Sequence, residues 1–255
     1  MTEARPVTAA VLLIGDELLS GRTQDTNLQT IAKFVGPLGV RIAEARVVPD
    51  VEEEIAAALN TLRAKHDYVF TTGGIGPTHD DKTADSVALA FGVGIGVNEE
   101  ARAILEAHYG SPSALNEARL RMARTPHGAS LIANPVSRAP GFQIGNVFVM
   151  AGIPAVMRGM LQDVGPRLAG GAVLRARTVG AVGLREGEIA APLQALEESS
   201  PGVTFGSYPF YGAEGRTGVN LVARSTDPAA LAKAAAALMA LVAGFGVTPE
   251  EISEA

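Results

Sequence analysis

Cysteine is absent from this chain of 255 residues. The absence excludes a disulfide framework, a thiolate nucleophile and a zinc–cysteine site, and it suits the reducing cytoplasm. No apolar run approaches the ~20 residues that a membrane-spanning helix needs, and the first six residues lack the charged-then-apolar pattern of a signal peptide. We therefore expect a soluble, cytoplasmic protein without a membrane partner.

Positive charge is scarce, with 21 Lys and Arg residues against 27 Asp and Glu residues and a net charge of −6. Such a chain has no general attraction for the phosphates of nucleic acid, so nucleic acid is not an expected partner. A phosphorylated ligand would instead be bound by backbone amides, a few basic side chains and a metal ion. Arg22, Lys82 and Arg138 are the candidate basic residues, although each is more simply explained as a solvated surface charge.

Several catalytic motifs are missing as well. The sequence has no Gly-x-x-x-x-Gly-Lys-Ser/Thr phosphate loop, no His-Glu-x-x-His, no Gly-x-Ser-x-Gly and no three-glycine dinucleotide fingerprint. A serine hydrolase and a Rossmann dehydrogenase are therefore not expected.

Strand and helix patterns alternate along the first part of the chain. Apolar stretches at residues 7–14, 40–48 and 67–72 predict strands, and apolar residues at helical spacing follow each of them. The alternation predicts an α/β fold with a doubly wound, mostly parallel sheet, in which ligands bind at the carboxyl ends of the strands.

Polar residues at the predicted helix starts indicate caps. Thr26, with Gln29 at capping-box spacing, is predicted to cap the helix after the first strand, and Asp50 the helix after the second. Further elements are predicted as helices at residues 98–109 and 113–124 and as strands at residues 129–133 and 142–150.

Gly170-Gly171 is the predicted domain boundary, which divides the chain into residues 1–170 and 171–255. The second part is predicted to be a small α+β domain. Its expected elements are strands at residues 172–182, 203–208 and 218–224 and helices at residues 186–198 and from Asp227 onward.

A glycine-rich stretch with two adjacent carboxylates, Thr71–Thr83, follows the third predicted strand. Three glycines within four residues free the backbone to approach a ligand, and the amides at the start of the next helix favour an anion. Asp80 and Asp81 would repel that anion unless a divalent cation lay between them, and Mg²⁺ binds one or two carboxylates together with phosphate oxygens. The stretch predicts a metal-bridged phosphate site; the alternative is a structural turn whose aspartates cap a helix.

Two other loops, Gly15–Arg22 and Gly152–Pro154, also follow predicted strands. Because the carboxyl ends of parallel strands meet at one edge of a sheet, we expect all three loops to converge there. Taken singly, the acids of the first loop are equally explained as helix caps, and Asp25 and Asn27 as turn residues.

At these motifs the sequence resembles the molybdopterin-binding superfamily of the MoaB and MogA type, and within it the N-terminal half of the competence/damage-inducible CinA proteins. The resemblance extends over essentially the whole chain and implies a molybdopterin-binding fold followed by a small α+β domain. Asp81 and Thr83 match the Asp-x-Thr of the superfamily. The resemblance is carried by Gly15–Arg22, Asp25-Thr26-Asn27, Thr71–Thr83, Ala139-Pro140-Gly141-Phe142 and Gly152-Ile153-Pro154.

The motifs and the resemblance together define the candidate site. The candidate catalytic residues are Asp80, Asp81 and Lys82. The candidate metal ligands are Asp16, Asp80 and Asp81. The candidate ligand-binding residues are Asn27, Gly73, Gly74, Gly76, Pro77, Thr78, Thr83, Ser137, Gly141, Gly152 and Pro154.

Two functions follow from the resemblance. It implies a metal-dependent nucleotide pyrophosphatase that hydrolyses a dinucleotide diphosphate such as ADP-ribose or FAD. A related domain occurs in eukaryotic FAD synthase. The alternative is a protein that binds molybdopterin or an adenylylated pterin, or transfers an adenylyl group, without hydrolysis. The expected cofactor is Mg²⁺, with Mn²⁺ and Co²⁺ open, and the expected assembly is a homo-oligomer, a dimer or a trimer. Because the chain ends at Ala255, the deamidase activity of full-length CinA proteins is not expected.

Overall fold

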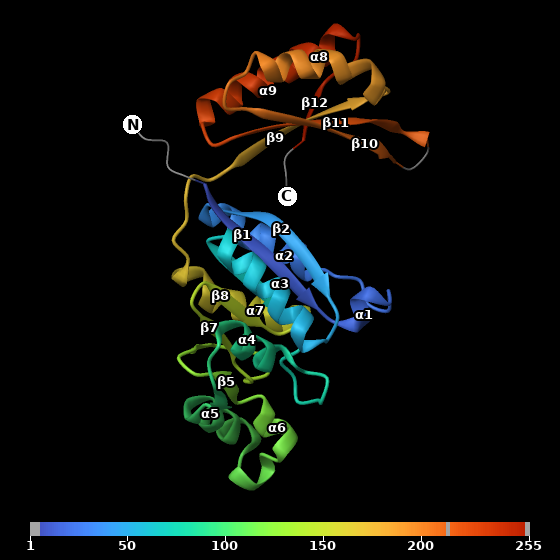
Figure 1. Cartoon of the computed structure of the whole chain (residues 1–255). Coiled ribbons are helices and arrows are strands. Elements are labelled where there is room, and N and C mark those ends of the chain that lie inside the picture. The colour runs from blue at the N-terminus through green and yellow to red at the C-terminus, as the bar shows by residue number, and fades with distance from the viewer. Residues whose placement is uncertain (1–5, 213–214, 253–255) are drawn as a thin grey trace. The chain divides into compact units, whose positions relative to one another are not determined.

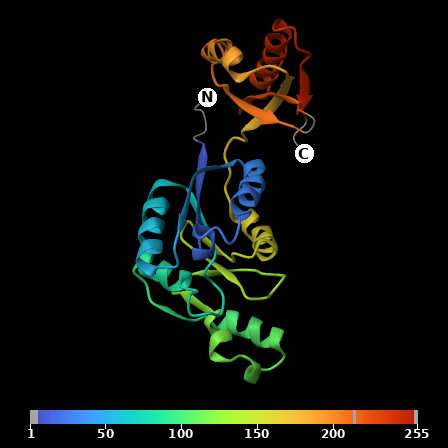
Figure 2. The ribbon, with the colours of Figure 1, turned by 90° about the vertical axis from the view of Figure 1, so that its right-hand side faces the viewer.

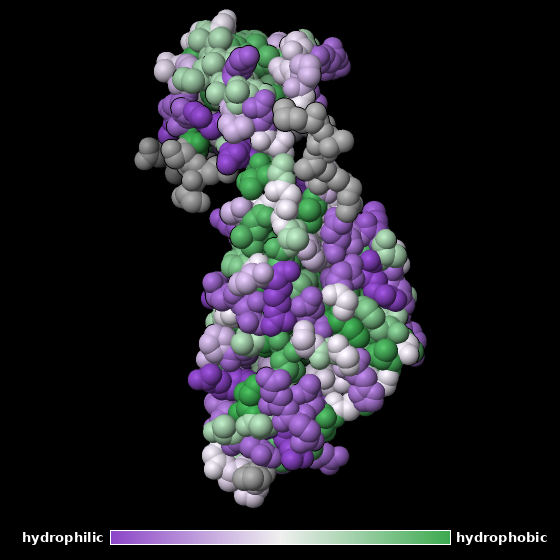
Figure 3. All heavy atoms as spheres, turned by 90° about the vertical axis from the view of Figure 1, so that its left-hand side faces the viewer, coloured by the Kyte–Doolittle hydropathy of each residue, from purple (hydrophilic) through white to green (hydrophobic). Residues whose placement is uncertain are grey.

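The computed structural model describes residues 6–212 and 215–252, and the chain divides into two compact units, residues 1–172 and 173–255. Figures 1 and 2 show the elements of each unit. On the face drawn in Figure 3, hydrophilic and hydrophobic side chains are interspersed. Within the described residues, no helix combines the length and the apolar character needed to cross a membrane.

Within residues 6–172, six strands form one sheet in the order β2-β1-β3-β8-β7-β6. The pairs β1–β2, β1–β3 and β3–β8 are parallel, whereas β8–β7 and β7–β6 are antiparallel. The strands are β1 (Val7–Ile14), β2 (Val40–Val48), β3 (Tyr68–Thr72), β6 (Ser130–Ile132), β7 (Gly141–Ile144) and β8 (Val147–Met150).

Helices cover both faces of this sheet because its central strands are apolar on both sides. Leu12 and Ile14 of β1 belong to a core formed with α3 (Glu52–Lys65) and α4 (Thr83–Phe91). Val11 and Leu13 point to the other core, formed with α2 (Asn27–Val35) and α7 (Pro154–Val164). Successive strand residues face opposite sides, so the predicted doubly wound, mostly parallel sheet is confirmed.

A small subdomain, called the inserted subdomain below, lies between α4 and β6 in the chain. It consists of the two-stranded sheet β4 (Ile95–Val97) and β5 (Arg124–Pro126) with α5 (Glu99–Tyr109) and α6 (Glu117–Arg121). Ala101, Leu105 and Ala123 form a core of its own. Remaining short helices are α1 (Asp16–Leu19) and the 3₁₀ turns Gly36–Leu38, Pro112–Ala114 and Gly165–Arg167.

The second unit has the element order β-α-β-β-α-β within its described residues. Its sheet has the order β10-β11-β9-β12 with antiparallel pairs throughout, an arrangement of the ferredoxin-like type. The helices pack on one face of the sheet through an apolar core. The elements are β9 (Arg175–Val182), α8 (Glu186–Glu198), β10 (Thr204–Tyr211), β11 (Thr217–Ser225), α9 (Pro228–Gly244) and β12 (Glu250–Ile252).

Two predicted elements of the first unit are wrong in extent. The strand at residues 142–150 is a hairpin, because Gly145 adopts a left-handed φ of 54° and reverses the chain between β7 and β8. The helix at residues 113–124 is only α6, whose N-terminus is fixed by Asn116; its side chain accepts a 2.9 Å hydrogen bond from the Arg119 amide. The strand β12 is missing from the prediction.

Both predicted helix caps are also wrong in chemistry. Thr26 occupies the cap position of α2 without a side-chain hydrogen bond; instead the Asp25 carboxylate accepts hydrogen bonds from the amides of Asn27 and Leu28 at 3.0 and 3.1 Å. Asp50 does not cap α3, because its carboxylate accepts a 2.9 Å hydrogen bond from the Asp16 amide in the neighbouring loop.

Candidate functional site

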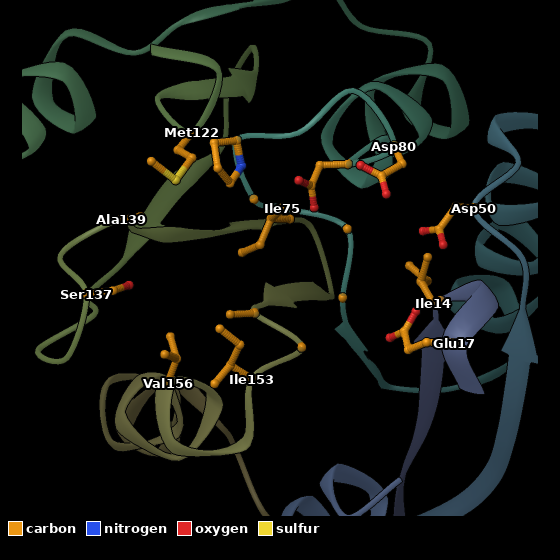
Figure 4. A pocket seen from close by; sticks show the side chains of 18 of the residues that line it. Ile14, Glu17, Asp50, Ile75, Asp80, Met122, Ser137, Ala139, Ile153 and Val156 are labelled. Atoms are coloured by element: carbon orange, nitrogen blue, oxygen red, sulfur yellow. The ribbon is translucent and has the colours of Figure 1, made fainter. Parts of the chain in front are cut away.

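The carboxyl ends of β1, β2, β3 and β8 open onto a cavity of about 440 Å³. Figure 4 shows Glu17, Asp50 and Asp80 along one side of this cavity and Met122, Ser137, Ala139 and Val156 along the other. Eight of the predicted site residues line it, namely Gly73, Gly74, Gly76, Pro77, Asp80, Asp81, Ser137 and Gly152.

The first two glycines of the loop after β3 have conformations and surroundings that exclude a side chain. Gly73 has a φ of 107°, and a Cβ there would lie 2.1 Å from the carbonyl oxygen of Ile14. Gly74 has a φ of 66°, and its Cβ would lie 2.2 Å from Thr83 Oγ1. The backbone of this loop is therefore bare where it faces the cavity.

Thr83 fixes the base of the glycine loop rather than lining the cavity. Its hydroxyl is buried and donates a 2.9 Å hydrogen bond to the carbonyl of Gly73, while its amide donates to the carbonyl of Gly74 at 3.0 Å. These two bonds close the loop onto the first turn of α4, so that residues 75–82 form a separate arch.

Thr78 is a hydrogen-bond donor to the second of the two predicted acids. Its amide and its hydroxyl donate to Asp81 Oδ2 at 2.8 and 2.6 Å. Hydrogen bonding by Thr78 is also the largest cause that holds the pKa of Asp80 below its ordinary value, with smaller contributions from His79 and Lys82.

Asp50 and Glu17 bring two more carboxylates to the cavity. Burial raises the pKa of Asp50, and the negative charges of Asp16, Glu17 and Asp80 raise it further, against the lowering effect of the hydrogen bond from the Asp16 amide. Negative charge therefore accumulates around Asp50 on the acidic side of the cavity.

The oxygen donors of this acidic side are the chemical type that Mg²⁺ binds. Within the described residues, no three His, Asp or Glu side chains are grouped closely enough to hold a metal ion by themselves. The donor set fits an ion that is held by one or two carboxylates and completed by the oxygens of a bound phosphate, and it does not fit an all-protein cage.

The opposite wall is shaped by Asn134, which is buried. Its Oδ1 accepts from the amides of Val136 and Ser137, and its Nδ2 donates to Ser137 Oγ at 2.6 Å and to the carbonyl of Ala139 at 2.7 Å. This single side chain therefore sets the course of the loop that presents Ser137 and Ala139 to the cavity.

The remaining predicted residues support the cavity from outside its lining. Asn27 is buried and donates to the Gly152 carbonyl at 2.7 Å. Pro154 begins α7, and Gly141 lies in β7, where a Cβ would meet the Val149 carbonyl at 2.3 Å. Lys82 precedes α4, and Asp16 contributes its amide to Asp50. Among the predicted basic residues, Arg22 bonds Ser20 in its own loop, and Arg138 has an unusual φ of 65°.

Sequence reasoning did not assign Asp50, Asn134 or Met122 to the site. A signal for Asp50 existed, because it lies two residues after the end of β2, and polar residues after parallel strands meet at the ligand-binding edge. Met122 follows α6 in the inserted subdomain, and nothing local in the sequence indicates that it lines this cavity.

Comparison with known proteins agrees with this architecture. Residues 10–170 match the family described as the probable molybdopterin binding domain, and residues 177–251 match the middle domain of FAD synthase. A CinA-like protein of Citrifermentans bemidjiense is 41% identical over 201 residues, which cover 75% of this chain and 49% of that protein. The chain spans about half the length of the curated CinA-like relatives it matches.

Solved structures align with the first unit. The crystal structure of the protein CinA, of unknown function, from Thermoplasma acidophilum aligns with a TM-score of 0.60 and 34% identity, covering 63% of this chain and 96% of that chain. The tungsten cofactor synthesizing protein MoaB from Pyrococcus furiosus aligns with a TM-score of 0.43 and 21% identity, covering 64% and 92%. The chain therefore belongs to the CinA-like proteins, and its first unit belongs to their molybdopterin-binding domain family.

Proposed function

We propose that this chain is a metal-dependent nucleotide pyrophosphatase that hydrolyses a dinucleotide diphosphate such as ADP-ribose or FAD. The observation that carries the proposal is the composition of the cavity at the strand ends. Bare glycine backbone, four carboxylates and an apolar wall line the same space of about 440 Å³. A diphosphate joined to a ring-bearing group matches these three surfaces.

The phosphates would bind along the glycine backbone. Gly73, Gly74 and Gly76 lie on the cavity, and Gly152 faces them from the turn before α7. A Cβ at Gly152 would lie 3.2 Å from the Cα of Gly73, so the two turns approach each other closely. The N-terminus of α7, an eleven-residue helix, adds the positive end of its dipole to this side.

The carboxylates would provide the chemistry. Asp80 or Asp81 would hold a divalent ion, which would supply Lewis-acid stabilisation of the negative charge that develops on the phosphate. We assign Asp50 the role of proton acceptor, because its raised pKa makes it a better base than an ordinary aspartate. Water oxygen attacks phosphorus, its proton passes to Asp50, and the bridging oxygen leaves with the second phosphate.

The apolar wall would hold the base or the flavin ring. Ile75, Met122, Ala139, Ile153 and Val156 line it, and the side chain of Ile153 is 65% exposed. An exposed isoleucine at the mouth of a cavity is a natural contact for a planar ring. The match of residues 177–251 to the middle domain of FAD synthase also supports a nucleotide substrate.

A second function is supported by the family of the first unit, whose description is a probable molybdopterin binding domain. The same glycine backbone and apolar wall suit a pterin phosphate or an adenylylated pterin. In that case the chain binds its ligand, or transfers an adenylyl group, without hydrolysis.

The test is a substrate and metal screen with product analysis. The full chain is incubated with ADP-ribose, FAD and related dinucleotides in Mg²⁺, Mn²⁺ or Co²⁺, and products are separated by chromatography. Release of AMP supports the pyrophosphatase, whereas a metal-replete protein that is inert towards the whole panel overturns it. Calorimetry with a pterin phosphate then separates the alternative, because tight binding without nucleotide hydrolysis supports a binding protein. A homo-oligomer stays a prediction, which sedimentation of the same samples tests.

A further inference from the structure

Arg121, the last residue of α6, reaches the glycine loop from the inserted subdomain. Its Nη2 donates a 3.3 Å hydrogen bond to the backbone carbonyl of Asp81. Together with Gly74, Gly76, Asp81 and Met122 it lines a small cavity of about 20 Å³, and those four residues also line the main cavity. The arginine therefore lies directly behind the wall that carries the candidate catalytic acids.

The ion pair between Arg121 and Asp85 accounts for this placement only in part. The carboxylate of Asp85 is 3.8 Å from Arg121 Nη2, but both of its oxygens already bind Arg124, at 2.6 and 3.1 Å. The Nε of Arg121 is buried and has no hydrogen-bond partner among the described residues. A buried donor without a partner costs free energy. The long ion pair with Asp85 therefore does not by itself explain why the guanidinium lies here.

The hydrogen bond from Arg121 to the Asp81 carbonyl holds the arch formed by residues 75–82. The arch at residues 75–82 is closed at its base by Thr83 and braced internally by the bonds between Thr78 and Asp81. Within the part of the chain that the structure describes, Arg121 provides the hydrogen bond that ties this arch to an element outside the loop and α4. Its removal would leave the arch free to move as a unit.

We propose that Arg121 is a positioning residue, which fixes the arch and thereby the two carboxylates of Asp80 and Asp81 towards the cavity. The proposal rests on the proposed function for its catalytic consequence, but the mechanical part does not depend on any substrate. The inserted subdomain, with its own apolar core, acts as the rigid base from which Arg121 holds the loop.

The mechanical part is tested in the free protein by amide hydrogen exchange. Arg121→Met keeps the aliphatic stem and removes the donor, and Arg121→Lys keeps a donor on a shorter head. Arg102→Met on α5 is the matched control, because its ion pairs with Glu99 and Glu106 lie on the surface. We expect about tenfold faster exchange across residues 75–82 in Arg121→Met, little change in Arg121→Lys, and none in the control. Equal exchange in Arg121→Met and the control overturns the proposal.

The catalytic part is tested by the division between kcat and KM. A displaced pair of acids should lower kcat by about 100-fold and leave KM within about threefold, with partial recovery in Arg121→Lys. A rise in KM at unchanged kcat would instead mean that Arg121 binds the substrate itself, and it overturns the positioning role. If the wild-type chain hydrolyses no dinucleotide, the proposed function fails while the exchange experiment still decides whether Arg121 holds the arch.

Discussion

Asn27 and Gly152 are 125 residues apart in sequence and are joined by a 2.7 Å hydrogen bond from Asn27 Nδ2 to the glycine carbonyl. The same amide lies 3.4 Å from Thr72 Oγ1, at the end of β3. The buried asparagine at the start of α2 therefore ties together two of the turns that line the candidate site.

Asn27→Ala should remove this tie and leave the Gly152 carbonyl without its partner. The expected loss is about 1–3 kcal/mol in the free energy of unfolding, because a buried polar group loses its hydrogen bond. Urea unfolding measures the change. Asn60→Ala is the control, since Asn60 is exposed on α3 and its side chain accepts a hydrogen bond from Arg63, one helical turn away; an equal loss in both variants would contradict the account.

Gly74→Ala should be far more disruptive than its backbone conformation alone predicts. Gly74 and Gly92 have nearly the same φ, 66° and 65°, but a Cβ at Gly92 meets nothing within 4 Å. Gly92→Ala should cost about 1 kcal/mol, the penalty of a left-handed alanine. Gly74→Ala should cost about 2 kcal/mol more, because its methyl group would collide with Thr83 Oγ1. Thermal unfolding of the pair isolates the collision, and equal melting temperatures would refute it.

Asp50→Asn should stabilise the fold and lower the catalytic activity. The raised pKa of Asp50 means that folding disfavours its charged form, so the stability associated with this carboxyl is lost as pH rises through its pKa. Asparagine can still accept the hydrogen bond from the Asp16 amide. We expect the melting temperature at pH 7 in chelator to rise by about 2 °C and turnover to fall; a lower melting temperature would count against the electrostatic account of this cavity.

Glu44, which lies within β2, gives the opposite pH dependence. Hydrogen bonds from Lys65, His66 and Arg46 hold its pKa at about 2, against an ordinary value of 4.5. Its stabilising contribution is therefore complete above pH 4.5 and is lost as pH falls towards 2. Glu44→Gln should unfold at lower temperature than wild type at pH 7, and the difference should shrink below pH 4.5. The exposed Glu53→Gln is the control; a difference that is constant with pH would exclude the mechanism.

The two-sided core of the first unit could be predicted from sequence because it depends on local patterns. The run from Val7 to Ile14 is apolar at every position except Thr8, and such strands are buried on both faces of a parallel sheet. The convergence of the loops followed from the same rule. The hairpin at Gly145 was missed although Gly145-Asn146 is a two-residue turn signal, because the apolar stretches before and after it were interpreted as one strand.

The details of the site depend on contacts between distant segments, which one sequence does not reveal. Asp50 has the spacing of a helix cap, yet its carboxylate binds the amide of Asp16 across the loop. Arg121 and Met122 approach the glycine loop because the inserted subdomain packs against α4. Thr83 matched a ligand-binding motif, and its hydroxyl is instead committed to the Gly73 carbonyl.

The central claim is that the acids beside the glycine loop hydrolyse a diphosphate, and the most direct test is AMP release from ADP-ribose in Mg²⁺ by wild type and Asp81→Asn. Asparagine preserves an acceptor for the Thr78 hydrogen bonds, so the fold and melting temperature should be retained. The account predicts AMP and ribose 5-phosphate from wild type and a rate at least about 100-fold lower in Asp81→Asn. Equal rates in the two proteins, or no AMP from wild type with any divalent ion, would contradict it.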